Sequence, residues 1–508
     1  MSGTHAKIDS NVTGLRYAEE ETLQTLPATP TWITLEPNSY SDFGGQTTLI
    51  ARNPINSSRQ RKKGVITDLD ASGGFETDLT QDNMTDMFQG LFFADHRTKA
   101  EFTDIGAVTT STIAITDTTG FTVGSLVKTS GMGVTSNNGM RRVTTVTSNT
   151  SLTLTPALTA ETNAPATSKV VEVGYQCASG DINVTTTGSF ATYTSTTLDF
   201  TTLGLIPGEW IYVGGDEAAL KFVTAANNGF KRVRSVAANA LVVDKSEADM
   251  SNETGSGLTI QIFFGKVLKN ETGTDIVRRT YQLERSLGAP VIASPHDEQA
   301  EYLTGALWNE ATIKIPQANK VMMDCTFVAC DHETVDDSVG LKSGNRPTLL
   351  DSDAFNTSSD FSRLRMSLVS SSDEAPEPLF AYLTEMNVTV NNNVSPNKAV
   401  SVLGAFDVTA GTFMVSADIT AYFSTVSAVA AIRANSDVTL DFVLAKDNAG
   451  IAVDIPLIAL GDGRLDVQQD QPITLPLDSQ AATAAKIDTN LNHTMLMVFF
   501  DYLPTAAM

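Results

Sequence analysis

The chain has 508 residues, of which 41% are hydrophobic and 18% charged, a balance typical of folded globular proteins. Its 58 acidic and 34 basic side chains give a formal net charge of -24, which argues against a protein that grips nucleic acid through the phosphates. Only three cysteines occur, Cys177, Cys325 and Cys330, which indicates a reducing compartment rather than a disulfide framework. The start of the chain lacks a signal-peptide core, and no apolar run suits a membrane helix. We therefore expect a soluble protein of about two to four domains.

Strands dominate the predicted elements. Short runs rich in Thr, Val, Ile and Phe lie between turn residues, as at 111–115, 151–155 and 387–390, and the apolar run 495–500 predicts a strand covered on both faces. Helices are expected in three places, where apolar residues recur at helical spacing. These are Thr80 to Phe93, Ser294-Pro295 through Leu307, and Ala421 to Ile432.

A basic cluster and two pairs of carboxylates lie close together in the first part of the chain. Arg59, Arg61, Lys62 and Lys63 follow a turn-forming segment, which favours either an exposed loop or an arm that docks on an acidic neighbour. In the next segment, alternation puts Asp68 and Asp70 on one face of a strand, and likewise Glu76 and Asp78. A sheet with a carboxylate-lined face is expected there.

The central part of the chain contains a repeat. The segment Gly124 to Gly131 and the later Asn137-Asn-Gly turn are echoed by Gly208 to Gly215 and Asn227-Asn-Gly. Two copies are too few for a solenoid, so they predict two small duplicated β-barrel or sandwich domains with cores of their own. The expected division is 1–105 and 269–508 as two parts of one domain, with 106–190 and 191–268 inserted between them.

Catalytic and metal-binding patterns are weak. Of five histidines, only His296 and His332 lie in a cluster with two carboxylates, and neighbouring residues of a strand point to opposite faces. No phosphate-binding loop, dinucleotide fingerprint or nucleophile elbow occurs. We expect no catalytic residue, no metal and no cofactor, and therefore a protein that is not an enzyme.

Both flanks of the repeats resemble the tail tube proteins (major tail proteins) of long-tailed, non-contractile bacteriophages. The matching residues in the first flank are Arg52–Gln60, Lys63-Gly64, Asp68–Asp70, Gly74-Phe75 and Phe88–Phe93. Those in the second are Tyr281–Arg285, Tyr302–Gly305, Trp308-Asn309, Gly404, Phe413 and Phe500–Pro504. Their order is preserved on both sides of the interruption.

The resemblance implies a tail-tube β-sandwich or half-barrel with a flanking helix, six copies of which close into a ring. Rings would stack into the conduit through which DNA is ejected, with the two repeats projecting outward. Its partners would be itself, the tape-measure protein, the tail terminator and tail tip proteins, while DNA would pass without specific binding and no membrane would be entered. The protein would be assembled in the host cytoplasm and reside in the virion tail. The basic cluster would then be an inter-subunit stacking loop, and Asp68, Asp70, Glu76 and Asp78 would face the lumen.

Two other classes of protein remain compatible with the sequence. Tandem β domains on a scaffold are also typical of a tail adhesin or receptor-binding protein. An enzyme that cleaves polysaccharide through paired carboxylates is a third class, but no particular pair stands out.

Overall fold

The computed structural model describes residues 8, 10–55, 57–188, 190–288, 299–335, 341–349, 352–370 and 373–508. The protein is mainly β, with antiparallel sheets and two short α-helices in this part of the chain, so the predicted fold class is confirmed. It divides into two compact units. The first holds Met1–Ala94, Glu271–Thr357 and Thr384–Ile419, and the second holds Asp95–Asn270, Ser358–Leu383 and Thr420–Met508.

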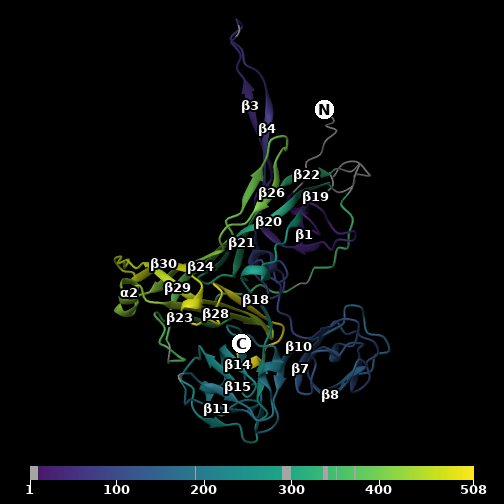
Figure 1. Cartoon of the computed structure of the whole chain (residues 1–508), viewed down its shortest axis with the longest axis vertical. Coiled ribbons are helices and arrows are strands. Elements are labelled where there is room, and N and C mark those ends of the chain that lie inside the picture. The colour runs from purple at the N-terminus through teal and green to yellow at the C-terminus, as the bar shows by residue number, and fades with distance from the viewer. Residues whose placement is uncertain are drawn as a thin grey trace. The chain divides into compact units, whose positions relative to one another are not determined.

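The first unit is built on antiparallel strands (Figure 1). Its elements are β1 (Gly14–Glu19), β2 (Ile33–Leu35), β3 (Pro37–Arg52), β4 (Lys62–Asp78), α1 (Phe88–Phe92), β19 (Tyr281–Gly288), β20 (Gln299–Pro316), β21 (Met322–Ala329), β22 (Asp331–Val335), β24 (Leu383–Asn391), β25 (Ser395–Lys398), β26 (Ala405–Thr409) and β27 (Met414–Tyr422). In its sheet, β3 pairs with β4, β4 with β21, β21 with β20, and β20 with β24. The division into units passes through β24 and β27.

This sheet has one apolar and one polar face because its strands alternate. Phe75 of β4, Cys325 of β21, Ala311 of β20 and Val390 of β24 lie in one cross-strand row, and all are buried. Such alternation is typical of an antiparallel sheet with one face on a core and the other open. The other face is described below as a candidate site.

The second unit contains two β lobes and a C-terminal sheet (Figure 1). The lobe strands are β5 (Glu101–Phe102), β6 (Thr112–Ala114), β7 (Ser125–Ser130), β8 (Gly139–Thr147), β9 (Ser151–Thr155), β10 (Lys169–Gln176), β11 (Asn183–Thr185), β12 (Thr192–Thr194), β13 (Trp210–Val213), β14 (Gly229–Ala237), β15 (Ala240–Asp244), β16 (Glu253–Thr254) and β17 (Gln261–Phe263). The remaining elements are β18 (Lys266–Lys269), β23 (Phe361–Leu368), α2 (Val426–Arg433), β28 (Val438–Lys446), β29 (Ala449–Asp462), β30 (Thr474–Ala481) and β31 (Leu496–Phe500).

The two lobes repeat the same local structure. In the first, β7 pairs with β8 so that Leu126 faces Arg142, and in the second β13 pairs with β14 so that Trp210 faces Arg232. The equivalent turn asparagines, Asn137 and Asn227, are both fully buried. Asn137 Nδ2 donates to Glu161 Oε1 at 2.9 Å, and Asn227 Nδ2 donates to Glu253 Oε2 at 2.8 Å. The repeated sequence motif is therefore a buried turn clamp that is present twice.

Each lobe has a core of its own, as the repeat predicts, centred on residues such as Ile113 and Val143 in the first and Tyr193 and Val243 in the second. A third cluster was not predicted. It joins Trp210 and Phe263 of the lobes to Val498 and Phe500 of β31 and to strands β28 and β29. The lobes are therefore packed into the second unit rather than attached as separate bodies within it. The expected division into four segments stays a prediction.

Of the three predicted helices, two are present in shortened form. The one at Thr80 to Phe93 is helical only over α1, because Thr80 and Asn83 bond each other's backbone N–H groups and hold a turn there. The one at Ala421 to Ile432 forms later, as α2.

The predicted helix through Leu307 is wrong. Residues 299–316 are strand β20, which is buried on both faces in its middle, so the strand alternation is hidden in the sequence. Its expected start, Ser294 to Glu298, lies outside the described residues. The strands predicted at 111–115, 151–155, 387–390 and 495–500 are confirmed by β6, β9, β24 and β31.

Candidate functional site

The predicted basic cluster lies at the tip of a long hairpin. Strands β3 and β4 extend beyond the rest of the first unit (Figure 1), and residues 46–67 of this hairpin are here called the arm. Arg59 and Arg61 lie in the connection and Lys62 and Lys63 begin β4, all of them exposed. With Arg52 the arm carries five cations, and its sequence contains no Asp or Glu. The arm is thus a local positive region on a chain of net charge -24.

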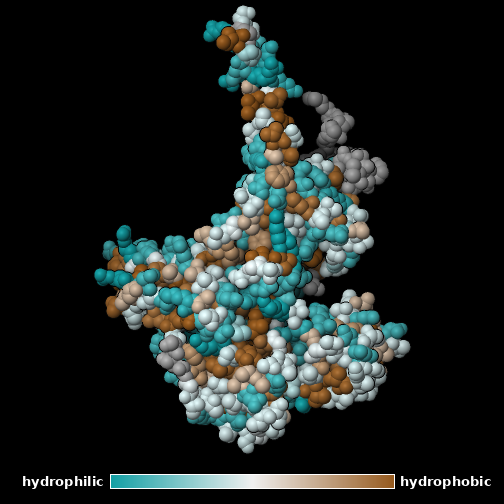
Figure 2. Space-filling model, in the orientation of Figure 1, coloured by the Kyte–Doolittle hydropathy of each residue, from teal (hydrophilic) through white to brown (hydrophobic). Residues whose placement is uncertain are grey.

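Exposed aliphatic side chains also follow the arm, as the brown atoms along it in Figure 2 show. Leu49 is opposite Ile66 and Ile50 is opposite Val65, and each of these four side chains is more than half exposed. Neighbouring residues of a strand point to opposite faces, so both faces of the arm carry apolar groups. Contiguous exposed apolar surface of this kind marks an interaction site. Sequence reasoning had identified the charges of the arm but not its apolar faces.

The four predicted carboxylates share one strand and one face. Asp68, Asp70, Glu76 and Asp78 lie on β4, between residues such as Leu69 and Phe75 that are buried. The expected alternation is therefore present.

Each of these carboxylates has a lysine partner, which the sequence did not indicate. Lys398 Nζ lies 2.6 Å from Asp68 Oδ2 and 2.5 Å from Asp70 Oδ1. Lys314 Nζ lies 2.9 Å from Glu76 Oε2, and Lys320 Nζ lies 2.6 Å from Asp78 Oδ2.

The protonation equilibria of these groups follow from the ion pairs. The hydrogen bond from Lys398 lowers the pKa of Asp68, and the bonds to Asp68 and Asp70 raise the pKa of Lys398. Partial burial opposes the charge of Lys314, but its bonds to Asp324 and Glu76 prevail and raise its pKa. Lys314 and Lys398 therefore remain cationic, and all three lysines are occupied by carboxylates of the chain itself.

The carboxylates of β4 belong to a wider polar face of the sheet. Glu76 is in register with Asp324 of β21, which is in register with Thr312 of β20 and then Thr389 of β24. The Thr312 and Thr389 hydroxyls are 2.9 Å apart. Here "the polar face" denotes this solvent face of β4, β21, β20 and β24.

Further acidic side chains were missed by the sequence reasoning. Asp418 alternates with the buried Ala417 and Ile419 in β27, and Asp478 alternates with the buried Leu477 and Ser479 in β30. Asp418 and Asp478 form no ion pair within the described residues. Alternation around each residue is the signal that could have identified them.

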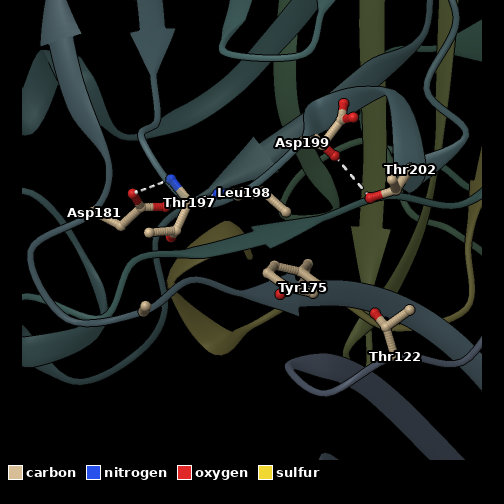
Figure 3. A pocket seen from close by; sticks show the side chains of 8 residues that line it. Thr122, Tyr175, Asp181, Thr197, Leu198, Asp199 and Thr202 are labelled. Carbon is tan, nitrogen blue, oxygen red and sulfur yellow. Dashed lines mark hydrogen bonds between the residues drawn. The ribbon is translucent and has the colours of Figure 1, made fainter.

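A hollow of about 300 Å³ lies in the second unit, and Figure 3 shows its lining. Asp181 points into a loop, where it accepts hydrogen bonds from the Ser195 hydroxyl at 2.6 Å and from the N–H groups of Thr196 and Thr197 at 3.0 Å each. Burial acts against its charge, but these bonds hold the pKa of Asp181 at about 2. Tyr175 donates its hydroxyl to the carbonyl of Val123. These polar groups hold the protein's own loops, and no acid–base pair converges on the hollow.

The histidine–carboxylate triplet that the structure describes, Asp331 to Glu333, likewise holds structure. Glu333 is 2.6 Å from Lys342, and His332 lies beside it in β22, while His5 and His296 fall outside the described residues. Across the described ranges, no three His, Cys, Asp or Glu side chains gather closely enough to bind a metal ion. Nor is any described helix long and apolar enough to cross a membrane. The buried Cys325 and Cys330 lie in and just after β21.

Comparison with known proteins assigns the family. No curated protein matches the chain. The family model described as phage tail tube protein matches residues 173–481, which is more than half of the chain and includes the second lobe, β19 to β22 and β23 to β30. This family is structural and is not known for enzymatic activity, and its members are components of the virion tail. The chain belongs to the phage tail tube protein family.

Proposed function

We propose that the protein polymerises into stacked rings that form the tail tube and line the path along which DNA is ejected. The observation that carries this proposal is the sheet of the first unit, which is apolar on one face, polar on the other, and extended by an arm with exposed apolar faces. A free protein avoids long exposed edge strands and apolar hairpins, whereas an assembling subunit uses them for pairing.

The arm would dock on a neighbouring subunit in the tube. Its five cations, including Arg59, Arg61, Lys62 and Lys63, fit the acidic surface of another copy of a chain with a net charge of -24. Its aliphatic residues would be covered in the contact. Opposite charge chiefly steers and orients such contacts, while apolar burial supplies much of their stability.

The polar face would form the wall of the lumen. A wall with free lysines would retain DNA, because each phosphate contact releases counterions and the affinity accumulates along the duplex. On this face Lys314, Lys320 and Lys398 are each occupied by carboxylates, so the wall can include cations without presenting them to phosphate. Asp68, Asp70, Glu76 and Asp78, joined by Asp418 of β27, would keep the duplex away from the wall.

The resemblance extends the proposal to partners and location. Besides itself, the chain would contact the tape-measure, tail terminator and tail tip proteins, and it would assemble in the host cytoplasm before entering the virion. Six copies of the tube fold would close each ring.

Electron microscopy of the purified protein tests the proposal directly. Straight tubes with a regular axial repeat are the expected result. Persistent monomers or single trimers without tubes would contradict it and favour a tail adhesin.

Cysteine protection tests the assignment of the lumen. Asp418→Cys should react with a polyethylene-glycol maleimide in monomers but not in assembled tubes, because the reagent is too bulky to enter the bore. Thr150→Cys, on the exposed surface of the first lobe, should react in both states. Full labelling of Asp418→Cys in intact tubes would refute the assignment.

The role of the arm is tested by charge reversal. Changing Arg59, Arg61, Lys62 and Lys63 to Glu should abolish or slow polymerisation at low salt while leaving the circular dichroism of the monomer unchanged. The matched control reverses Lys169 and Lys221, which lie on the lobes, and should assemble normally. Normal tubes from the arm variant would contradict the proposed contact.

A further inference from the structure

One set of elements in the first unit has a defined order and pairing. The set runs β1, β3, β4, α1, β19, β20, β21, β22 along the chain. In it β1 pairs with β19, β19 with β20, and β20 with both β21 and β22, while β21 pairs with β4 and β4 with β3. This set is called the first copy.

A second set later in the chain repeats that order and pairing. It runs β23, β24, β27, α2, β28, β29, β30, β31. Here β23 pairs with β28, β28 with β29, and β29 with both β30 and β31. Strand β30 is the neighbour of β27, and β27 the neighbour of β24. Every pairing of the first copy thus has its counterpart. The leading hairpin is β3 with β4 in the first copy and β24 with β27 in the second, and in both copies the helix follows the second of these strands.

The register agrees as well as the order. In the first copy Tyr281 faces Ala306 and the pairing then shifts so that Leu283 faces Leu303. In the second, Val438 faces Ile458 and the pairing shifts in the same way, so that Leu440 faces Ile455. A β-bulge at the same step of the same strand pair is a specific feature that is retained within families. Agreement in both topology and irregularity indicates duplication of the whole fold.

The copies differ in what is added to them. The first contains the two β lobes between α1 and β19, and its leading hairpin carries the arm. The second has no lobes between α2 and β28, and its leading hairpin carries the short strands β25 and β26 between β24 and β27. Such additions conceal the duplication from a search for internal sequence repeats.

The two copies are joined by strand pairing. Seven residue pairs, from Glu310 opposite Asn391 to Pro316 opposite Glu385, connect β20 of the first copy to β24 of the second. The Asn391 amide donates to Glu310 Oε2 at 2.5 Å across this junction. Since β24 corresponds to β3, the junction shows how one copy of the fold pairs with the next.

The corresponding edges at the two ends of the pair are open. The shared bulge aligns Leu303 of β20 with Ile455 of β29. Strand β20 has a second bulge, at Trp308 to Glu310, that adds one residue and has no counterpart in β29. The segment of the second copy that corresponds to Glu310–Pro316 is therefore 461–467. Within the described residues, this segment pairs only with β30 and β3 pairs only with β4. Leu465 and Val467 are 37% and 67% exposed. An exposed edge with apolar side chains is a template for another strand.

We infer that each chain is a fused pair of tube folds, and that three chains close a ring. Segment 461–467 of one chain pairs with β3 of the next chain, in the part of β3 that precedes the arm (residues 37–45). The inference rests on the proposed function, which supplies the ring of six tube folds. Two kinds of junction then alternate around the ring. Inside a chain β20 pairs with β24, and between chains segment 461–467 pairs with β3.

Cryo-electron microscopy of tubes formed by the full chain measures the number of chains per ring. The expected result is threefold symmetry with six similar sheets, in which the lobes recur three times. Six chains per ring in well-formed tubes would overturn the inference and leave the proposed function standing. Absence of tubes and rings would overturn both.

Disulfide trapping tests the contact itself. Inside the chain, Pro316 is opposite Glu385, which lies two residues after the start of β24. Val467 corresponds to Pro316, and Ser39 lies two residues after the start of β3. Ser39 is therefore expected opposite Val467 of the neighbouring chain. A chain with both Ser39→Cys and Val467→Cys, oxidised after assembly, should give covalent dimers and trimers and no larger species on a denaturing gel. Each single variant is the matched control and should stay monomeric, because the native cysteines are buried. A ladder that continues to six chains, or no cross-link in intact tubes, would contradict the pairing.

Discussion

The two lobes of the second unit have the same internal clamps but different attachments. Arg142 and Arg232 occupy equivalent positions, opposite Leu126 and Trp210. Arg142 is half-buried and forms no ion pair within the described residues. Arg232 is only 4% exposed and binds Asp244 at 2.9 Å and Asp454 of β29 at 3.2 Å. After duplication, the residues that form the turn were kept, while those facing the C-terminal sheet diverged.

The largest expected effect lies in that difference. Replacing Arg232 by Met leaves the buried Asp454 without its cation and Asp244 with Arg234 alone, and breaking a buried pair from one side costs about 3–5 kcal/mol. Burial raises the pKa of Asp454 to about 6 despite the nearby arginine, so this site tolerates little further loss. Arg142→Met is the matched control and should cost under about 1 kcal/mol. Urea unfolding of both variants provides the measurement, and equal losses would remove the distinction between the lobes.

An intermediate effect should be common to both lobes. Asn137→Ala and Asn227→Ala each remove a buried amide that bonds a glutamate and the backbone of Thr159 or Ser251, which costs about 1–3 kcal/mol. Because the clamps are equivalent, the two losses should agree within about 0.5 kcal/mol. Proteolysis of the Asn-Asn-Gly turns, followed by mass spectrometry, reports each lobe separately. A large loss of stability from only one of the two substitutions would show that only one clamp stabilises its lobe.

The smallest effect depends on pH and concerns the second lobe. The pKa of Asp181 is held at about 2, below its ordinary value of 3.8, so its stabilising bonds are fully present above pH 3.8 and are lost as the pH falls through about 2. Asp181→Asn should therefore lower stability by about 1 kcal/mol at pH 7 and by progressively less as the pH approaches 2. The control change Asp104→Asn, at an exposed residue of the first lobe, should leave the denaturant midpoint at pH 7 nearly unchanged. Denaturant midpoints of both variants are measured between pH 2 and 7. A loss of stability for Asp181→Asn that stays constant over this range would contradict the idea.

Local features of the sequence predicted much of this molecule. Alternation identified β4 and the common face of Asp68, Asp70, Glu76 and Asp78, and the turn motif identified the duplicated lobes. The charge contrast identified the tip of the arm. These inferences depend on neighbouring residues, whose geometry follows from the period of a strand or the demands of a turn.

Other features depend on partners that are distant in the chain. The middle of β20 reads as a helix because both its faces are buried, and its burial follows from β21 and β24 rather than from its own residues. The same holds for the tube fold, whose two copies are recognised by pairing and by a shared bulge and not by similar residues.

The sequence by itself determined the β-rich class, the repeated clamps, and which side chains share a face of β4. Only the tertiary structure decided that Lys398, which is 330 residues from Asp68 along the chain, neutralises part of that face. It also decided which edges are satisfied within the chain and which remain open. Strand alternation specifies the two faces of a sheet, but the hydrogen bonds at its edges are made by backbone groups that every residue possesses, so their partners are chosen by the fold as a whole.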